Sequence, residues 1–146
     1  SDVCSSDLGI TAETLKDAPP VEKVIKDFQE FVGSLPMVGY NAAKSDLPIL
    51  AEHGLDYSQQ YKVDLYDEAF ERRSSDLHGI ANLKLQTVAS FLGFQGQSHN
   101  SLEDARMTAR VYESFLESDQ ARELLETESI LSNNPFGGLD LSQLFD

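Results

Sequence analysis

The sequence lacks the features that mark secreted and membrane-bound proteins. Its single cysteine, Cys4, excludes an intrachain disulfide among the 146 residues, and this favours a reducing compartment. No run approaches the roughly 20 apolar residues that are needed to cross a membrane. No charged segment followed by a short apolar stretch marks a secretory signal. We therefore expect a cytoplasmic protein without a membrane partner.

Basic residues are also scarce: 11 Lys and Arg stand against 25 Asp and Glu, for a net charge of −14. Such a surface does not attract phosphate backbones over a broad area. It still allows an enzyme that meets phosphates through divalent cations, because the bound metal supplies positive charge at the site. Other chemistries are not indicated, since the sequence has no glycine-rich phosphate loop, no cysteine spacing for zinc and no Gly-x-Ser-x-Gly element.

The length and apolar patterning are those of one α/β domain. Apolar residues at helical spacing predict a helix over residues 21–32. Short buried strands are predicted over residues 35–40 and 61–65, with a helix from residue 47 to 53 between them. This strand–helix–strand order predicts a parallel sheet with helices packed on it.

The second half of the chain predicts helices more than strands. A polar loop is expected over residues 72–82, followed by a helix over residues 83–92. A last long helix begins near residue 101, and its pattern weakens from residue 118. Its expected buried face comprises Leu102, Ala105, Ala109, Tyr112 and Leu116.

A histidine stands five residues before an aspartate where this last helix begins. His99 can accept a proton near neutral pH, and Asp104 offers the hard oxygen ligands that Mg²⁺ and Mn²⁺ prefer. The segment Ser101-x-x-Asp104 is also a capping box, in which Asp104 would satisfy backbone N–H groups. Taken alone, the pattern favours the capping box.

Asp46 is a second aspartate at the end of a predicted element. It follows a buried strand at its C-terminal end, where ligands gather in open α/β sheets. The alternative is a helix N-cap ahead of Pro48, which would occupy an early helical position. Asp46, Asp104 and His99 indicate a divalent-metal site only when they are taken together.

Four segments, in order, resemble the DnaQ-like (DEDDh) 3′–5′ exonucleases, a family that includes bacterial proofreading subunits. Tyr40-Asn41-x-x-x-Ser45-Asp46 resembles the second motif of the family, and His99-x4-Asp104 resembles the third. Residues 84–93 resemble the helix before the third motif, and residues 9–19 resemble the start of the first conserved helix. The resemblance covers about residues 9–117 and implies a ribonuclease H-like α/β fold.

The resemblance implies hydrolysis of phosphodiester bonds at nucleic-acid 3′ ends by a pair of Mg²⁺ or Mn²⁺ ions. Asp46 and Asp104 would be metal ligands, and His99 would be the general base that takes a proton from the attacking water. The candidate substrate-binding residues are Asn41, Tyr40, Lys84 and Arg106. For the two basic residues, the alternative is an ordinary solvated surface charge.

The implied substrate is the 3′ end of single-stranded DNA or RNA, and the implied protein partners are a DNA polymerase or a sliding clamp. The terminal segment Ser142–Phe145 is weakly similar to peptides that dock on clamps, with a disordered chain end as the alternative.

The sequence departs from the family in three places. Tyr40 stands where histidine is usual and Ser45 where an aromatic residue is usual, and both changes affect substrate contacts more than chemistry. The family's Asp-x-Glu pair does not occur among the 146 residues. We therefore expect an incomplete fold, in which the first strands of the mixed sheet are missing, and a chain that is inactive alone.

The expected organisation follows from this departure. Residues 1–8 look like the translation of a sequencing adapter and are expected to be non-native. A partial exonuclease domain is expected over residues 9–118, followed by an acidic, flexible tail over residues 119–146. The alternative to an exonuclease is a non-catalytic module that binds nucleic acid or a replication protein.

Overall fold

The structure, a computed structural model, describes residues 9–96 and 100–133. His99, the adapter-like residues 1–8 and the clamp-like segment 142–145 lie outside the described residues, so the predictions for them stay predictions. The chain divides into two compact units, residues 1–112 and residues 113–146. Each unit is described by itself below.

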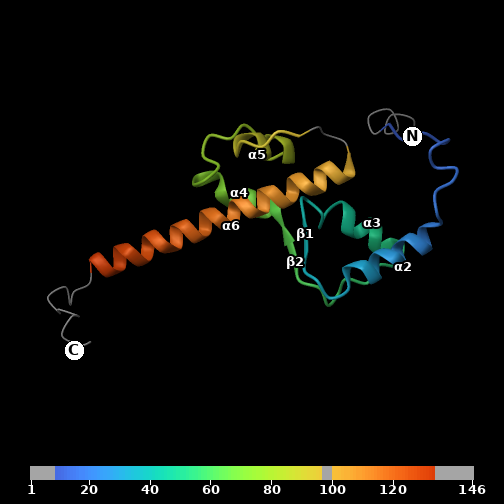
Figure 1. The fold of residues 1–146 in the computed structure, drawn as a ribbon, viewed down its shortest axis with the longest axis horizontal. Helices are drawn as coiled ribbons and strands as arrows, with labels where there is room; N and C mark the ends of the chain where they lie inside the picture. The colour runs from blue at the N-terminus through green and yellow to red at the C-terminus, as the bar shows by residue number, and fades with distance from the viewer. Residues whose placement is uncertain (1–8, 97–99, 134–146) are drawn as a thin grey trace. The chain divides into compact units, whose positions relative to one another are not determined.

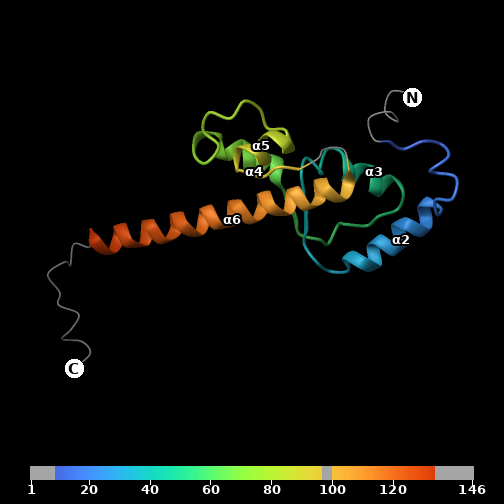
Figure 2. The ribbon, with the colours of Figure 1, turned by 45° about the horizontal axis from the view of Figure 1, so that its top comes forward.

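The first unit contains two short strands and several helices, shown in two views in Figures 1 and 2. Its elements follow in the order α2 (Val21–Val32), β1 (Met37–Gly39), α3 (Asp46–Glu52), β2 (Lys62–Asp64), α4 (Leu65–Glu71), a 3-10 turn η1 (Arg72–Ser74), α5 (Leu85–Phe91) and the start of α6 (Ser101–Ser132).

The two strands form a parallel pair, with Met37 opposite Lys62 and Gly39 opposite Asp64. Parallel strands require a crossover connection, and the chain between them supplies one that contains α3. The predicted strand–helix–strand unit is therefore confirmed. Figure 1 shows α2 and α3 towards one end of this unit and α4 and α5 towards the other, with the strands between them.

Helix α2 has the bounds that its apolar spacing predicted. It begins after Pro20 and ends at Gly33, which has a φ of 55° and donates its N–H to the Gln29 carbonyl. A left-handed residue at a helix end is well tolerated by glycine, which has no Cβ. Of the apolar stripe of this helix, only Ile25 is buried.

The fully buried apolar side chains of the first unit come from helices and from one connecting segment. They are Leu65, Ala69, Leu77, Val88, Ala89 and Val111, each with none of its surface exposed. Leu77 lies within residues 72–82, which were predicted to form a polar loop, and it is buried all the same. Arg72, in the same segment, is buried and pairs with Asp76 at 2.8 Å and Glu68 at 3.6 Å.

The start of α6 buries a different face from the one predicted. Leu102 is 57% exposed, whereas Met107, Thr108 and Val111 are buried. Both sets of residues recur at helical spacing, and periodicity alone does not reveal which row the rest of the fold covers. Helix α6 also continues to Ser132, beyond the point where the apolar pattern weakens.

The second unit contains the remainder of α6 among its described residues. Its large apolar side chains are exposed over much of this length, by 66–71% for Leu124, Leu125, Ile130 and Leu131. No described helix of either unit is long and apolar enough to cross a membrane.

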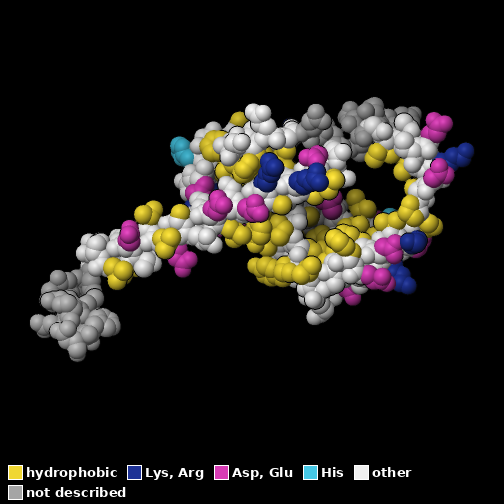
Figure 3. Space-filling view, viewed as in Figure 1, with side chains coloured by type: hydrophobic (Ala, Val, Ile, Leu, Met, Phe, Trp, Pro, Cys, Tyr) yellow, Lys and Arg dark blue, Asp and Glu magenta, His cyan; other side chains and the backbone are white. Residues whose placement is uncertain are grey.

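Hydrophobic side chains are also exposed around the strand pair. Leu35 is 65% exposed, Val38 37% and Tyr61 72%. Figure 3 shows hydrophobic side chains gathered over the strands and α2 on the face turned to the viewer. The short sheet is therefore only partly covered by the described residues.

Candidate functional site

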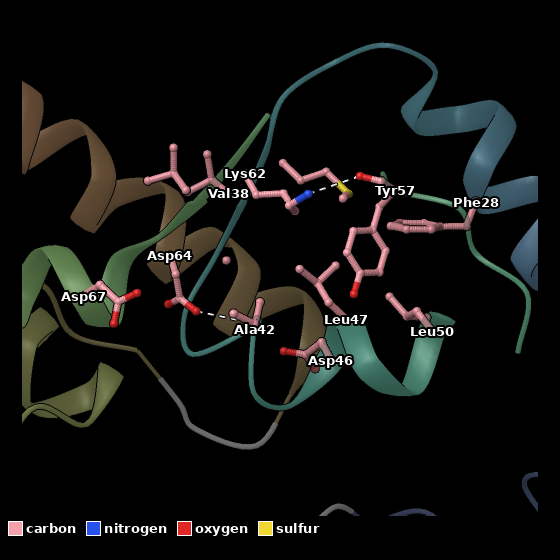
Figure 4. A pocket seen from close by; sticks show the side chains of 14 residues that line it. Phe28, Val38, Ala42, Asp46, Leu47, Leu50, Tyr57, Lys62, Asp64 and Asp67 are labelled. Atoms are coloured by element: carbon pink, nitrogen blue, oxygen red, sulfur yellow. Dashed lines mark hydrogen bonds between the residues drawn. The ribbon is translucent and has the colours of Figure 1, made fainter. Parts of the chain in front are cut away.

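The carboxyl ends of β1 and β2 lie at the same edge of the sheet, because Gly39 is opposite Asp64 in the parallel register. A cavity of about 540 Å³ opens beside this edge. Figure 4 shows that Asp64 and Asp67 lie at one end of the cavity, that Phe28 and Tyr57 lie at the other, and that Asp46 lies between them beside Leu47. The cavity therefore has an acidic end and an apolar end.

The chain makes a tight turn directly after β1. A Cβ added at Gly39 would lie 2.4 Å from the Cβ of Ala42, so only glycine allows the loop to fold back this closely. Asn41 has a φ of 55°, a left-handed conformation that asparagine tolerates better than most residues. These two residues bring residues 41–45, hereafter the β1–α3 loop, against the end of β2.

Asp64, the last residue of β2, holds the β1–α3 loop through backbone hydrogen bonds. Its Oδ1 accepts from the Asn41 N–H at 2.7 Å, and its Oδ2 accepts from the Ala43 N–H at 3.0 Å. The same Oδ1 accepts from the Tyr66 N–H at 3.1 Å, which makes Asp64 the N-cap of α4. Asp64 was not among the predicted site residues. Its signal in the sequence was an aspartate between an apolar strand and a helix.

Asp46 is the first residue of α3, is exposed and lines the cavity. Ser45 occupies the N-cap position, so the N-cap alternative for Asp46 was wrong. The Ser45 hydroxyl lies 2.8 Å from the Asn41 carbonyl oxygen and 3.0 Å from Asp46 Oδ2. Its single proton can be donated to one of these acceptors at a time. Asn41 and Asp46, which belong to the same predicted motif, are thus linked by Ser45.

Tyr40 links the end of β1 to the segment before α5. Its hydroxyl donates to the Leu83 carbonyl, and its ring meets Tyr66 edge-on with centroids 6.2 Å apart. Burial raises the pKa of Tyr40 to about 12, and the nearby Tyr66 and Asp64 add to the shift. The hydroxyl therefore stays protonated as a donor. Lys84, the residue after Leu83, is exposed beside this contact.

Asp104 lies in the first turn of α6, but it is not the residue that caps the helix. The Asn100 side chain caps it, because its Oδ1 accepts from the N–H groups of Leu102 at 3.0 Å and Glu103 at 3.4 Å. The prediction that Ser101 begins a capping box was therefore wrong by one residue. Asp104 is half-buried and lies three or four residues from Met107 and Thr108, on the buried face of α6.

Arg106 pairs with Glu103 at 2.7 Å and is 64% exposed. It lines a separate cavity of about 130 Å³ together with Met107 and Arg110. Neither Arg106 nor Asp104 is among the residues that line the cavity of Asp46. Tyr40, Asn41 and Lys84 are not lining residues of that cavity either. The structure thus links Asn41 to Asp46 through Ser45 and leaves Arg106 at another surface.

Carboxylate oxygens are the ligand type that Mg²⁺ prefers, and Asp46 offers them at an exposed position. Within residues 9–96 and 100–133, no group of three or more His, Cys, Asp or Glu side chains is arranged to hold a metal ion. The described residues therefore have the donor chemistry for a magnesium ion but not a complete set of protein ligands. Mg²⁺ often keeps several waters and uses only one or two carboxylates together with substrate phosphates.

The chain is similar in sequence to several known proteins. The chain is 27% identical over 114 residues to DNA polymerase III subunit epsilon of Aquifex aeolicus, an alignment that covers 75% of this chain and 54% of that protein. It is 25% identical over 137 residues to a PolC-type DNA polymerase III of Clostridium perfringens, covering 92% of this chain and 9% of that protein. It is 28% identical over 140 residues to Protein NEN2 of Arabidopsis thaliana, covering 87% of this chain and 27% of that protein.

The chain thus spans about half the length of the first of these relatives and less of the other two. No solved structure matches it significantly. Residues 1–112, which are most of the chain, match the model of the exonuclease family named for RNase T. The chain therefore belongs to this exonuclease family, in agreement with its resemblance to the DnaQ-like exonucleases.

Proposed function

We propose that this chain is part of a 3′–5′ exonuclease domain with a ribonuclease H-like fold, which hydrolyses phosphodiester bonds at DNA or RNA 3′ ends. The observation that carries the proposal is the position of Asp46. In a chain of the exonuclease family, this carboxylate is exposed at the carboxyl edge of a parallel strand pair, beside a cavity of about 540 Å³. Ligands gather at this edge in open α/β sheets.

Asp46 and Asp104 would hold the divalent cations, since each offers oxygen ligands suited to Mg²⁺ or Mn²⁺. A pair of such ions, when bound, stabilises the attacking and leaving oxygens of an in-line displacement. The two aspartates are fewer than the carboxylates that the family uses. We therefore propose that an Asp-x-Glu pair, absent from the 146 residues, is needed to complete the site.

The chain's own residues would take the remaining roles. His99 would accept the proton of the attacking water as general base. Asn41 lies on the loop beside Asp46 and would present its side-chain amide to the substrate. Tyr40 would fix the end of β1 for this contact, because its hydroxyl already donates to the Leu83 carbonyl. Lys84 and Arg106 would attract the phosphate backbone locally, within a chain of net charge −14.

The substrate would be a single-stranded 3′ end, as the resemblance to the DnaQ-like exonucleases implies. Two of the relatives are named as DNA polymerase III proteins. On that basis we propose that the intact protein works beside a DNA polymerase. The clamp-like segment 142–145 would be a further contact, and it lies outside the described residues.

A nuclease assay on a 5′-labelled single-stranded oligonucleotide tests the proposal. The chain of 146 residues is compared with a form extended at its N-terminus by an apolar strand segment that carries an Asp-x-Glu pair. We expect the first to be nearly inactive with Mg²⁺ and the second to shorten the oligonucleotide from its 3′ end. In the extended form, His99→Ala should lower the rate by about 100-fold or more.

An oligonucleotide blocked at its 3′ terminus by a phosphorothioate serves as the control, and it should resist the extended form. Robust Mg²⁺-dependent degradation by the 146-residue chain, lost on His99→Ala, would show that no Asp-x-Glu pair is needed. Binding of the oligonucleotide without any degradation by the extended form would instead favour the non-catalytic module.

A further inference from the structure

We infer that Asp64 is a positioning residue, which holds the β1–α3 loop so that Asp46 presents its carboxylate in one direction. The catalytic consequence of this inference rests on the proposed function, in which Asp46 binds metal. The structural part rests on hydrogen bonds alone. Asp64 itself would contact neither metal nor substrate.

The oxygens of Asp64 are engaged inside the protein. A carboxylate has about four lone-pair sites, and three backbone N–H groups occupy sites on this one. Two of these donors, from Asn41 and Ala43, come from the loop, and the third caps α4. Hydrogen bonds to a charged acceptor are stronger than neutral ones, so this acceptor is well suited to fixing a loop. The third donor ties Asp64 to the start of α4 as well as to the loop.

The loop in turn controls the start of α3. The Asn41 carbonyl accepts from the Ser45 N–H at 3.2 Å and lies 2.8 Å from the Ser45 hydroxyl. The Ala42 carbonyl accepts from the Leu47 N–H at 2.9 Å. Asp46 thus stands between two residues whose backbones are bonded to the loop. Its side chain meets the Ser45 hydroxyl within the same turn.

Asp67 provides a matched comparison because it is also an aspartate that lines the cavity. It lies in the first turn of α4 and is exposed. Removing its charge changes the field at the cavity much as removing the charge of Asp64 does, but it leaves the bonds from Asp64 to the loop in place. A difference between variants at these two positions therefore reports on positioning rather than on charge.

The experiment is an Mn²⁺ titration of the ¹⁵N-labelled 146-residue chain, followed by two-dimensional NMR. Paramagnetic Mn²⁺ broadens amide signals close to the ion, so binding at Asp46 is read from the signals of Asp46 and Leu47. Asp64→Asn keeps the shape of the side chain but places an amide N–H₂ towards one of the three donors. Asp64→Ser keeps an N-cap hydroxyl for α4 and is too short to hold the loop.

We expect the metal-free amide signals of Asn41, Ala43 and Asp46 to shift in both Asp64 variants and to stay in place in Asp67→Asn. We expect the Mn²⁺ concentration that half-broadens the Asp46 signal to rise about 10-fold or more in the Asp64 variants, as is typical when a partner that orients a metal ligand is lost. In Asp67→Asn this concentration should change much less.

Two results would overturn the inference. One is unchanged Mn²⁺ binding at Asp46 in the Asp64 variants although the loop signals shift. The other is weakened binding while the signals of Asn41 and Ala43 stay in place, which would make Asp64 a ligand itself. Failure of the proposed function has a different signature, namely no broadening at Asp46 even in a form extended by a strand that carries an Asp-x-Glu pair. The positioning inference is then decided by the metal-free shift of the Asp46 signal in Asp64→Ser against Asp67→Asn.

Discussion

The two aspartates proposed to bind metal are positioned by different kinds of contact. Asp46 follows a loop whose amides are held by Asp64, a residue 21 to 23 positions away from the donors. Asp104 stands in a helical turn that is capped by Asn100, and its own N–H bonds to the Asn100 carbonyl at 2.9 Å. The first arrangement exists only when two strands are paired, whereas the second is set within a few residues of chain.

This difference indicates where the candidate site is vulnerable. The first turn of α6 is held by a local cap, so the direction of the Asp104 side chain depends on fewer distant contacts. The β1–α3 loop needs the parallel register, the close approach at Gly39 and the carboxylate of Asp64 together. Substitutions at the Asp46 end should therefore lower the free energy of unfolding more than similar substitutions at the Asp104 end.

The largest effect in this comparison is expected from Gly39→Ala. The added Cβ would lie 2.4 Å from the Cβ of Ala42, an atom fixed to the backbone, so the loop must move. Overpacking of this kind costs typically about 2 kcal/mol in the free energy of unfolding. Urea denaturation followed by circular dichroism measures it.

Gly96→Ala is the matched control near α6, because its added Cβ would also lie 2.4 Å from another atom, the terminal methyl of Met107. A methionine side chain is flexible and can move aside. The loss in the free energy of unfolding should therefore be well below that of Gly39→Ala. Equal costs for the two variants would show that the β1–α3 loop is no more constrained than the segment before α6.

A smaller effect is expected at the Asp104 end from Asn100→Ala. Loss of an N-cap costs about 1 kcal/mol in the free energy of unfolding. Amide hydrogen exchange of Leu102 and Glu103, the two bonded donors, should become faster. Ser101→Ala should change stability by less than about 0.5 kcal/mol, because this surface residue is not the cap. A larger effect for Ser101→Ala would restore the capping box that begins at Ser101.

Tyr40→Phe, at the Asp46 end, is expected to have a smaller effect than Asn100→Ala. It removes one partly buried hydrogen bond to the Leu83 carbonyl, which is worth about 1 kcal/mol or less. The folded-state pKa of Tyr40, about 12, lies above its ordinary value of 10.0. The stability that depends on the neutral Tyr40 hydroxyl is therefore fully present below pH 10, and it is lost as the pH rises towards 12.

The Tyr40→Phe variant should lack this part of the alkaline loss of stability, which denaturation curves between pH 9 and pH 12 would reveal. Tyr61, which is 72% exposed, offers a control substitution, Tyr61→Phe, with little expected change. The same alkaline loss in all three proteins would mean that Tyr40 is not held as the structure has it.

Much of the secondary structure could be predicted from local patterns. Helix α2, the parallel strand pair and helix α5 follow from apolar spacing and from glycine at the helix ends. The closeness of Asn41 to Asp46 could also be predicted, because only four residues separate them in the sequence. The capping of α6 was missed because Asn100 and Ser101 are both good N-cap residues, and only the helix start decides between them.

Burial was harder to predict than helicity. The apolar row of α6 that includes Leu102 is exposed at that residue, while the row that includes Met107 and Val111 is buried. Leu77 is buried inside a segment whose composition is polar. In each case the choice depends on which elements pack against the segment, and this is information that a local pattern does not contain.

The sequence by itself determined the family, the strand–helix–strand order and the positions of Asp46 and Asp104 at the ends of their elements. These properties are local, because they depend on spacing, caps and turn residues. Only the tertiary structure assigned the role of Asp64, whose oxygens meet the Asn41 and Ala43 amides because the strand register places Asp64 opposite Gly39. A contact across more than 20 residues exists once the strands pair, and no shorter stretch of the chain encodes it.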